Sequence, residues 1–411
     1  MAVASMTPIE WLHKRLADGG EDLLREMLTV FAQTLMHAEA DTQCGAAYAT
    51  RSPERSNRRN GYRERRWDTR AGTIPLAIPK LREGSYFPEW LLDRRRRAEQ
   101  ALTTVVAESY VLGVSTRRVE HLVQAMGLTG ISKSQVSEMA QSLDPIVEDF
   151  RSRPLDTGPY RYVWLDALVI KCREGGRVVN VAVVVATAVN AEGHREILGA
   201  DAITREDGAG WLAFLRSLVS RGLSGVELVI SDAHQGLKDA VAATFPGASW
   251  QRCRTHFMVN LLTRVPKAAA SFVATLVRSI FAQPDADSAW TQHRHVVAQL
   301  EPRFAQAAVM LDDAAHDLLA FTAFPKAHWN QIWSNNPLER LNKEIRRRTD
   351  VVGIFPNRDA VIRLVGAVLA EQHDEWAVAR RYMSAESLAQ VQPLTIHQTT
   401  LPKEVSLSAI A

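Results

Sequence analysis

The chain has 411 residues and a net charge of +3, with 46% hydrophobic and 23% charged residues. This length exceeds one ordinary hydrophobic core, so two or three domains are expected, and the composition is that of a globular protein. Three scattered cysteines, Cys44, Cys172 and Cys253, exclude a disulfide framework and fit a reducing cytosol. The longest apolar run, residues 181–189, is far too short to span a membrane, and the N-terminus lacks a secretory signal pattern. We therefore expect a cytoplasmic protein with no membrane partner.

The first 98 residues combine helical periodicity with a cluster of arginines. Apolar residues recur at helical spacing between positions 8 and 38, and residues 73–92, punctuated by proline, are expected to be extended. Between them, residues 51–70 contain many arginines and no lysine. Arginine in such a turn-rich segment suits phosphate contacts, although a solvated linker is the alternative. We expect residues 1–98 to be a helical, Arg-rich DNA-binding region whose candidate contacts are Arg58, Arg59, Arg63, Arg65 and Arg66.

Residues 99–150 are predicted to form three short helices. Gly113 and Gly127 end the first two, and Ser132 with Gln135 forms a capping box for the third. Short helices joined by Gly-containing turns resemble a helix-turn-helix DNA-binding domain, although a small helical bundle has the same pattern. The candidate recognition helix runs over residues 132–143, with Lys133 and Gln135 as its candidate DNA contacts.

The segment from Val163 to Lys171 is apolar and β-branched, which predicts a strand buried on both faces. Asp166 lies in its middle, where a carboxylate is costly unless a cation, a metal or a hydrogen-bond network compensates it; a satisfied core aspartate is the alternative. Hairpin strands followed by strands alternating with helices make a mixed α/β sheet. The predicted strands are 163–171, 177–189, 195–199, 226–232 and 248–251, and the predicted helices are 207–221 and 237–245.

A second aspartate, Asp232, ends the predicted strand 226–232. If that strand neighbours the one holding Asp166, both carboxylates meet where the strands end. Mg²⁺ prefers oxygen ligands and keeps several waters, so two or three carboxylates hold one or two ions. Two such ions, about 3.5–4 Å apart, can activate a nucleophile and stabilise the leaving oxygen in phosphodiester displacement.

The region after residue 254 changes to helical spacing. One predicted helix begins at Asn336, taken as its cap, with Pro337 in the first turn. Glu339 is either a capping-box residue or a ligand, and Arg346 lies almost above it on the same face. Glu344 is the alternative candidate for the third ligand, and it lies about 140° round the same helix from Glu339. Residues 360–383 are expected to form a final helix.

Five segments occur in an order that resembles a known family. They are VWLDALVIK (163–171), LVISDAHQG (228–236), WQRCRTHF (250–257), SNNPLERLNKEIRRR (334–348) and RRTDVVGIFPN (347–357). Together they resemble the bacterial IS256-type transposases of the Mutator-like superfamily, which carry a DDE catalytic core of RNase H-like fold. The resemblance extends to about Ser384.

The resemblance implies a fold and a set of site residues. The fold would be α/β: an RNase H-like mixed sheet formed by residues 151–253 and 326–384, interrupted by an all-helical insertion at 254–325 and followed by a loose tail at 385–411. Asp166, Asp232 and Glu339 would be the catalytic residues and the metal ligands. Arg346 matches the family's basic position seven after the glutamate, and the further candidate DNA contacts on this helix are Arg347 and Arg348.

Cys253 and His256 match the family's C-x2-H motif. The pair is half of a zinc site, and no second pair follows at the usual spacing, so no zinc is expected. Packing or hydrogen bonding near the active site is expected instead, with His256 also a candidate DNA contact. His234, two residues after Asp232, is either a supporting residue of the site or an exposed loop histidine.

The implied function is that of a transposase, nucleoid-associated in the cytoplasm. It would bind the terminal inverted repeats of an insertion sequence, cut there with water as nucleophile, and join the freed 3′-hydroxyl to target DNA. Mg²⁺ would be the cofactor, replaceable by Mn²⁺, and pairing two ends implies a homodimer or higher oligomer. A nuclease or resolvase that never joins strands, and a DNA-binding regulator without catalysis, are the alternatives.

Overall fold

The structure, a computed structural model, describes residues 23–69, 71–92, 100–114, 116–125, 133–205 and 207–391. The chain forms two compact units, which divide at Asp144. Several sequence predictions lie outside the described residues: the start of the first helix, the helix signals at Gly127 and Ser132, and the tail beyond residue 391.

The first unit contains a β-hairpin where the sequence predicted a turn-rich or linker segment. Helix α2 (Leu23–Cys44) packs on strands β1 (Arg59–Thr69) and β2 (Gly72–Leu81), which pair antiparallel. Residues 59–69, expected to belong to a turn-rich segment or a solvated linker, are therefore a strand, whereas the expectation of an extended segment from residue 73 is confirmed. The physical reason is the period-two pattern of Ile74, Leu76 and Ile78, which buries one face of β2 in the core that includes α2.

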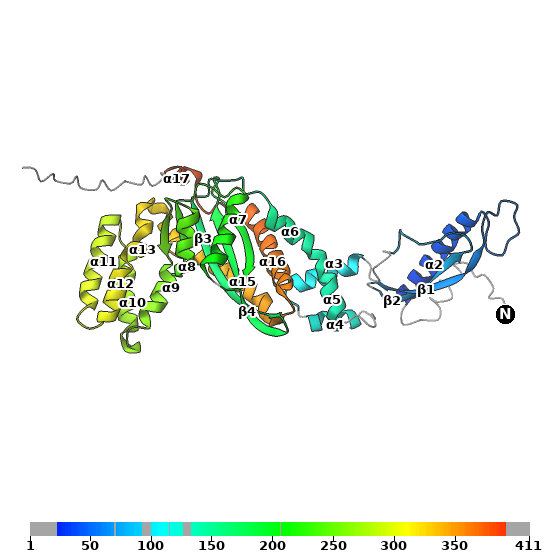
Figure 1. The fold of residues 1–411 in the computed structure, drawn as a ribbon, viewed down its shortest axis with the longest axis horizontal. Coiled ribbons are helices and arrows are strands. Elements are labelled where there is room, and N and C mark those ends of the chain that lie inside the picture. The colour runs from blue at the N-terminus through cyan, green and yellow to red at the C-terminus, as the bar shows by residue number, and fades with distance from the viewer. Residues whose placement is uncertain are drawn as a thin grey trace, which may run out of the picture. The chain divides into compact units, whose positions relative to one another are not determined.

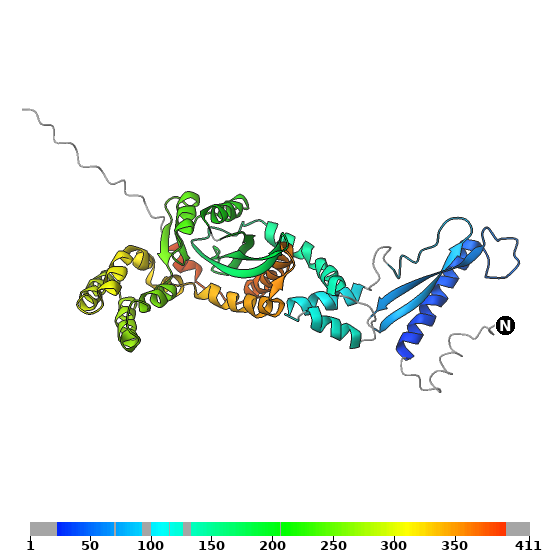
Figure 2. The same ribbon diagram turned by 60° about the horizontal axis from the view of Figure 1, so that its bottom comes forward.

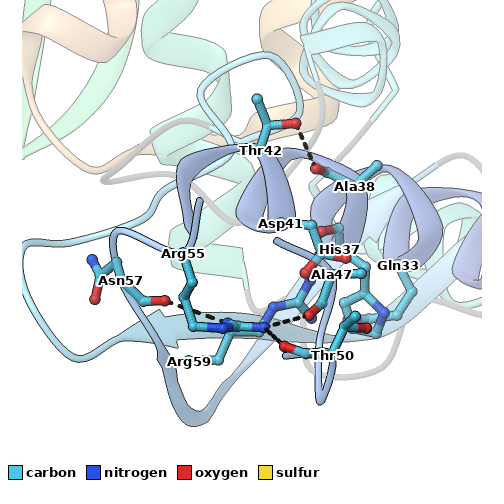
Figure 3. A network of polar contacts seen from close by, with 10 residues as sticks. All are labelled: Gln33, His37, Ala38, Asp41, Thr42, Ala47, Thr50, Arg55, Asn57 and Arg59. Atoms are coloured by element: carbon cyan, nitrogen blue, oxygen red, sulfur yellow. Dashed lines mark hydrogen bonds and ion pairs between the residues drawn. The ribbon is translucent and has the colours of Figure 1, made fainter. Parts of the chain in front are cut away.

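Two arginines of this region serve the unit's own structure. Figure 3 shows the Arg55 guanidinium turned back onto its own loop, where it donates to the backbone carbonyl of Thr50. Arg59 forms an ion pair with Asp41 and donates to the carbonyl of His37, and its side chain is only 4% exposed. These contacts fasten the loop and the start of β1 to helix α2.

Three short helices follow in the first unit, as predicted. They are α3 (Gln100–Val111), α4 (Thr116–Ala125) and α5 (Lys133–Ala140), and a 3₁₀ turn (Gln141–Leu143) continues the last. A small shared core of Leu102, Val106, Val119, Val123 and Val136 holds them together. The lengths and the packing fit the helix-turn-helix prediction, and they fit a small bundle equally.

The second unit is built around a six-stranded mixed sheet. Strands β3 (Tyr162–Glu174), β4 (Arg177–Val189) and β5 (Arg195–Ile203) are antiparallel, and β6 (Leu228–Ser231) and β7 (Ser249–Arg252) continue parallel to β3, in the order β5-β4-β3-β6-β7. A two-residue strand, β8 (Ile354–Phe355), also pairs with β3 and was not predicted from the sequence. The predicted mixed α/β sheet is confirmed.

Helices cover both faces of this sheet (Figure 2). Helices α7 (Gly208–Ser220) and α8 (Gln235–Thr244) contribute to the core cluster that contains Val163 and Leu165 of β3. Helix α15 (Asn336–Val352) packs on β3, and α16 (Arg358–Val378) packs on β3 and β5. Because side chains alternate along a strand, Trp164 and Asp166 belong to the face opposite Leu165.

The prediction that β3 is buried on both faces is wrong for its second half. Tyr162 to Leu165 are fully buried, but Val169 is 57% exposed and Lys171 is exposed as well. The pairing of β3 with β6 ends at Trp164, and the core cluster that β3 shares with α7 and α8 reaches only to Ala167. Only the face of Val169 and Lys171 is open, whereas the face that carries Asp166 stays buried at Leu168, Ile170 and Cys172.

Between β7 and β8 the described chain is helical throughout (Figure 1). The longer helices there are α9 (Arg254–Leu262), α10 (Lys267–Phe281), α11 (Ala286–Leu300), α12 (Ala305–Asp313), α13 (Ala315–Leu319) and α15. Helix α6 (Asp144–Ser152), which begins at the division between the two units, fits the predicted helix and break before β3. None of the helices in the described ranges is both long and apolar enough to cross a membrane.

The first residues of the predicted loose tail are packed against the second unit. Ser384 caps a short helix, α17 (Ala385–Ala389), and Leu388 and Val391 are buried. His328 links this helix to the sheet: its Nδ1 lies 2.7 Å from the Tyr162 hydroxyl, and its Nε2 lies 2.8 Å from the Ser387 hydroxyl. The expectation of a loose segment from residue 385 is wrong up to Val391, because these apolar side chains find a place in the core.

We predict that His328 makes stability sensitive to acid. Burial lowers the pKa of His328 below its ordinary 6.5, so the folded state disfavours the protonated ring more than the unfolded chain does. The free energy of unfolding should fall as pH drops below 6.5 and level off below the lowered pKa. His328→Gln should make this decline shallower in denaturant titrations from pH 8 to 5, whereas His295→Gln, at an exposed position, should not. An unchanged slope in His328→Gln would contradict the prediction.

Candidate active site

Asp166 and Asp232 lie on neighbouring parallel strands in matching positions. The register pairs Tyr162 with Leu228 and Trp164 with Ile230. Asp232 directly follows the last residue of β6, so the same register continued by two residues would set it opposite Asp166. The sequence analysis required that the strands of the two aspartates be neighbours, and β3 and β6 are neighbours in the sheet.

The Asp166 carboxylate receives one hydrogen bond on each oxygen. The backbone N–H of Ala167 donates to Oδ1 at 2.9 Å, and the Asn342 side chain donates to Oδ2 at 2.6 Å. Burial raises the pKa of Asp166, and the nearby Asp232 carboxylate adds to this, whereas the two hydrogen bonds and His256 act in the opposite direction. A cation bound nearby would lower the pKa of Asp166 and favour its charged form.

Asp232 is more open, and the C-x2-H residues lie beside it. Its side chain is 47% exposed, its Oδ1 accepts the Ala233 N–H at 2.7 Å, and its Oδ2 lies 3.8 Å from His256 Nδ1. The hydrogen bond to Cys253, and then the carboxylates of Asp232 and Asp166, raise the pKa of His256 to about 9. A protonated imidazole therefore faces the two carboxylates at neutral pH. His234 precedes helix α8 and makes no side-chain capping bond.

The loop before α15 is fastened to β3 and α9 by three hydrogen bonds. Trp164 Nε1 donates to the carbonyl of Ser334 at 3.2 Å, Asn335 Nδ2 donates to the carbonyl of Leu165 at 3.0 Å, and the Asn335 backbone N–H donates to Cys253 Sγ at 3.3 Å. Cys253 thus has a packing role between β7 and α15. Two of these bonds attach the start of α15 to Trp164 and Leu165, the residues directly before Asp166.

The predicted cap of α15 is wrong by one residue. Asn335 occupies the cap position and Asn336 is the first helical residue, with Pro337 in the first turn as predicted. The Asn335 side chain makes no capping bond, and its amide N–H instead donates to the Leu165 carbonyl. The capping-box interpretation of Glu339 lacks the side-chain cap that it requires.

The two candidate glutamates of α15 face different neighbours. Glu339 lies one turn before Asn342, the residue that reaches Asp166, so both belong to the same side of the helix. Glu344 forms ion pairs with Arg347 and Arg348, and the hydrogen bond from Arg348 lowers the pKa of Glu344.

The predicted DNA-contact arginines differ in how accessible they are. Arg346 is exposed, and Arg347 is exposed although paired with Glu344. Arg348 is 9% exposed and bridges Glu344 to Glu371 of α16. Arg348, like Arg59, is therefore committed to the chain's own structure.

In the first unit, the candidate contacts Arg58, Arg63 and Arg66 are exposed, and Arg65 is half-buried, 5.3 Å from the Phe87 ring centroid. Gln135 is half-buried on α5. Lys133 begins that helix, but its side chain lies outside the described residues.

Comparison with known proteins identifies the family. The model of the transposase family named Mutator matches residues 4–379. The chain belongs to this family. It is 61% identical over 381 residues to the transposase for insertion sequence element IS1081 of Mycobacterium tuberculosis, covering 93% of this chain and 92% of that protein.

More distant relatives extend the comparison. The chain is 37% identical over 363 residues to the transposase for IS256 in transposon Tn4001 of Staphylococcus aureus, covering 88% of this chain and 93% of that protein. It is also 37% identical over 377 residues to the transposase for ISRM5 of Rhizobium meliloti, covering 92% and 94%. The resemblance to IS256-type transposases that the five motifs predicted is confirmed.

The side chains around Asp166 in this transposase fit a divalent cation that prefers oxygen. Asp166 and Asp232 supply carboxylates, and the buried Oδ1 of Asn342 has no hydrogen-bond partner within the described part of the chain. Mg²⁺ takes oxygen ligands and keeps several waters, so such a set suits it. Among the described residues no three His, Cys, Asp or Glu side chains form a ready-made metal cluster, so Glu339 is not part of a preformed triad.

Sequence reasoning missed the two amides of this site. Asn335 and Asn342 lie in the motif SNNPLERLN, from which the sequence predicted a helix start and a candidate carboxylate but no role for these two residues. The available signal was that Asn342 follows Glu339 by three residues, so both lie on one side of a helix.

We predict that Asn335→Ala destabilises the transposase and that Asn336→Ala does not. Loss of the Asn335 amide leaves the buried Leu165 carbonyl without its donor, at a cost of about 1–3 kcal/mol. Asn336 is exposed, and its replacement should change stability by less than about 0.5 kcal/mol. Denaturant unfolding of both variants measures the difference. If Asn336→Ala proved the more destabilising, Asn336 would be the cap, and the hydrogen bond from Asn335 to the Leu165 carbonyl would be unimportant for stability.

Proposed function

We propose that this transposase is a DDE enzyme with an RNase H-like core, in which Asp166, Asp232 and Glu339 hold divalent metal. It cuts DNA at the terminal inverted repeats of its insertion sequence and joins the freed 3′-hydroxyl to target DNA. The observation that carries the proposal is the parallel pairing of β3 with β6, which brings the strand of Asp166 beside the strand that Asp232 directly follows. Asn342 of helix α15 is hydrogen-bonded to Asp166 at the same place. The sheet supports the fold assignment, since three antiparallel strands continue into two parallel ones.

The chain's own residues have separate tasks in this chemistry. Asp166, Asp232 and Glu339 would hold Mg²⁺, or Mn²⁺ in its place, which would supply activation of the attacking oxygen and stabilisation of the leaving oxygen of the phosphodiester. Asp166 within β3 and Asp232 directly after β6 belong to a rigid sheet, which would keep the ligand geometry fixed. Protonated His256, close to Asp232, supplies a positive charge that suits the phosphate of a bound DNA strand.

The placement on α15 favours Glu339 over Glu344 as the third carboxylate. Glu339 shares its side of the helix with Asn342, which touches Asp166. It also lies in the first turn, where the helix dipole favours a negative charge. Glu344 is neutralised by two arginines, and using it as a ligand would break the bridge from Arg348 to Glu371.

The remaining domain assignments form part of the same proposal. Residues 1–98 and the three-helix region 99–150 would recognise the DNA ends. Residues 151–253 and 326–384 would make up the catalytic core, and the helical segment 254–325 its insertion. Two ends must be brought together, so a homodimer or higher oligomer would assemble on double-stranded DNA.

We predict that Asp166→Asn, Asp232→Asn and Glu339→Gln each lower the rate of end cleavage about a hundredfold or more, because each removes a ligand worth several kcal/mol in the transition state. Glu344→Gln is the matched control on the same helix and should remain within about tenfold of the wild type. Cleavage is measured in Mg²⁺ on a duplex carrying the inverted repeats that flank the gene. DNA binding by all four variants should remain intact.

The same assay separates the competing interpretations. Pre-cut ends incubated with target DNA should give strand-joined product, whereas a nuclease or resolvase would give hydrolysis alone. If both aspartate variants cleaved DNA at the wild-type rate, the two aspartates would not be catalytic, and only the interpretation as a DNA-binding regulator would remain. Loss of activity in Glu344→Gln, with Glu339→Gln active, would reassign the third carboxylate.

The hairpin of the first unit provides a basic surface for the DNA ends. Arg58, Arg63 and Arg66 are exposed on or beside β1, which is anchored to α2 by Arg59. A rigid strand holds these guanidinium groups at fixed spacing, so less conformational entropy is lost on contact with phosphates than from a mobile linker.

We predict that Arg63→Ala and Arg66→Ala each weaken DNA binding and make its salt dependence less steep. Each lost phosphate contact should reduce the slope of log K against log salt concentration by about 1. Glu64→Gln, between them on the same strand, is the control and should not weaken binding. Titration of labelled DNA at several salt concentrations measures the slopes, and slopes equal to the wild type in both arginine variants would exclude these contacts.

A further inference from the structure

Asn342 is the residue of α15 that touches an aspartate of the site. It lies in the second turn of the helix and is 9% exposed. Its Nδ2 donates to Asp166 Oδ2 at 2.6 Å, a distance typical of a hydrogen bond to a charged acceptor. The contact joins the helix that carries Glu339 directly to the strand that carries Asp166.

We propose that Asn342 is a positioning residue of the active site, which fixes the Asp166 carboxylate for metal binding. The inference rests on the proposed function, since it assigns Asp166 a metal to hold. Ala167 N–H holds Oδ1 and Asn342 holds Oδ2, so together the two donors fix the rotation of the carboxylate. Donors of this kind orient ligands and favour their charged form.

The direction of the amide supports this role. With Nδ2 toward Asp166, the Oδ1 of Asn342 is left buried and without a partner among the described residues. The reversed amide would set its oxygen against a carboxylate oxygen, which is repulsive. Leaving a buried acceptor without a partner is costly, so the orientation of this amide is set by its donor contact with Asp166.

The test is Mn²⁺ binding, measured by calorimetry on the full-length protein, together with the Mn²⁺ concentration needed for half-maximal DNA cleavage. Asn342→Ala removes the donor, and Asn342→Asp keeps the size but replaces the donor by an acceptor. Both should weaken Mn²⁺ binding about tenfold or more, and raise the cleavage requirement accordingly. Thr349→Val, buried on the same helix two turns further on, is the control and should change neither quantity.

The outcomes separate a positioning role from packing. Mn²⁺ affinity equal to the wild type in Asn342→Ala would overturn the proposal. Unchanged or tighter binding by Asn342→Asp would also overturn it, because the oxygen and not the N–H donor would then matter. If Asn342→Ala lowers the folding midpoint, Asn342→Asp carries the test because it matches the native side chain in size.

Asp166→Ala distinguishes failure of this inference from failure of the proposed function. If Asp166→Ala abolishes Mn²⁺ binding and cleavage while Asn342→Ala changes neither, only the role of Asn342 fails. If Asp166→Ala leaves both intact, the proposed metal site fails and the role of Asn342 with it.

Discussion

The parallel pairing of β3 with β6 is the constraint on which the rest of the second unit depends. Parallel neighbours cannot be joined by a tight turn, so the chain must make a long crossover between them. Here β4, β5 and α7 form that crossover, and α7 buries its apolar side in the core beneath the two strands. The residues that build the sheet are therefore also those that bring the two aspartates, far apart in sequence, to matching positions.

The position of Asp166 along β3 is a compromise between burial and charge. Up to Leu165 the strand is buried, and an acidic side chain there would be strongly destabilising. Asp166 lies on the face of β3 that stays buried as far as Cys172, and two N–H donors with a nearby histidine partly offset the desolvation of its carboxylate. A carboxylate kept in this way is rigid and poorly hydrated, which are the properties expected of a metal ligand on a fixed scaffold.

Long, strongly patterned segments could be predicted from the sequence, and short or polar ones could not. The strand around Asp166 and the strand ending at Asp232 followed from unbroken apolar runs, and the family resemblance followed from motifs. The hairpin β1–β2 was missed because arginines on β1 hide the alternation that β2 shows clearly, and β8 was missed because two residues carry no period. Asn342 is indicated in the sequence only by its spacing of three residues from Glu339, and its contact with Asp166 arises when α15 packs on β3.

Helix α15 has three sides that make different contacts. Leu338, Leu341 and Ile345 are buried and fix the helix on the sheet. A second side carries Glu339 and Asn342, of which Asn342 contacts Asp166 of β3. A third side holds Glu344 and Arg348, whose ion pairs reach α16 and commit Glu344 to the packing of the helix. A helix divided in this way can add a carboxylate to two strand-borne aspartates without losing its own packing.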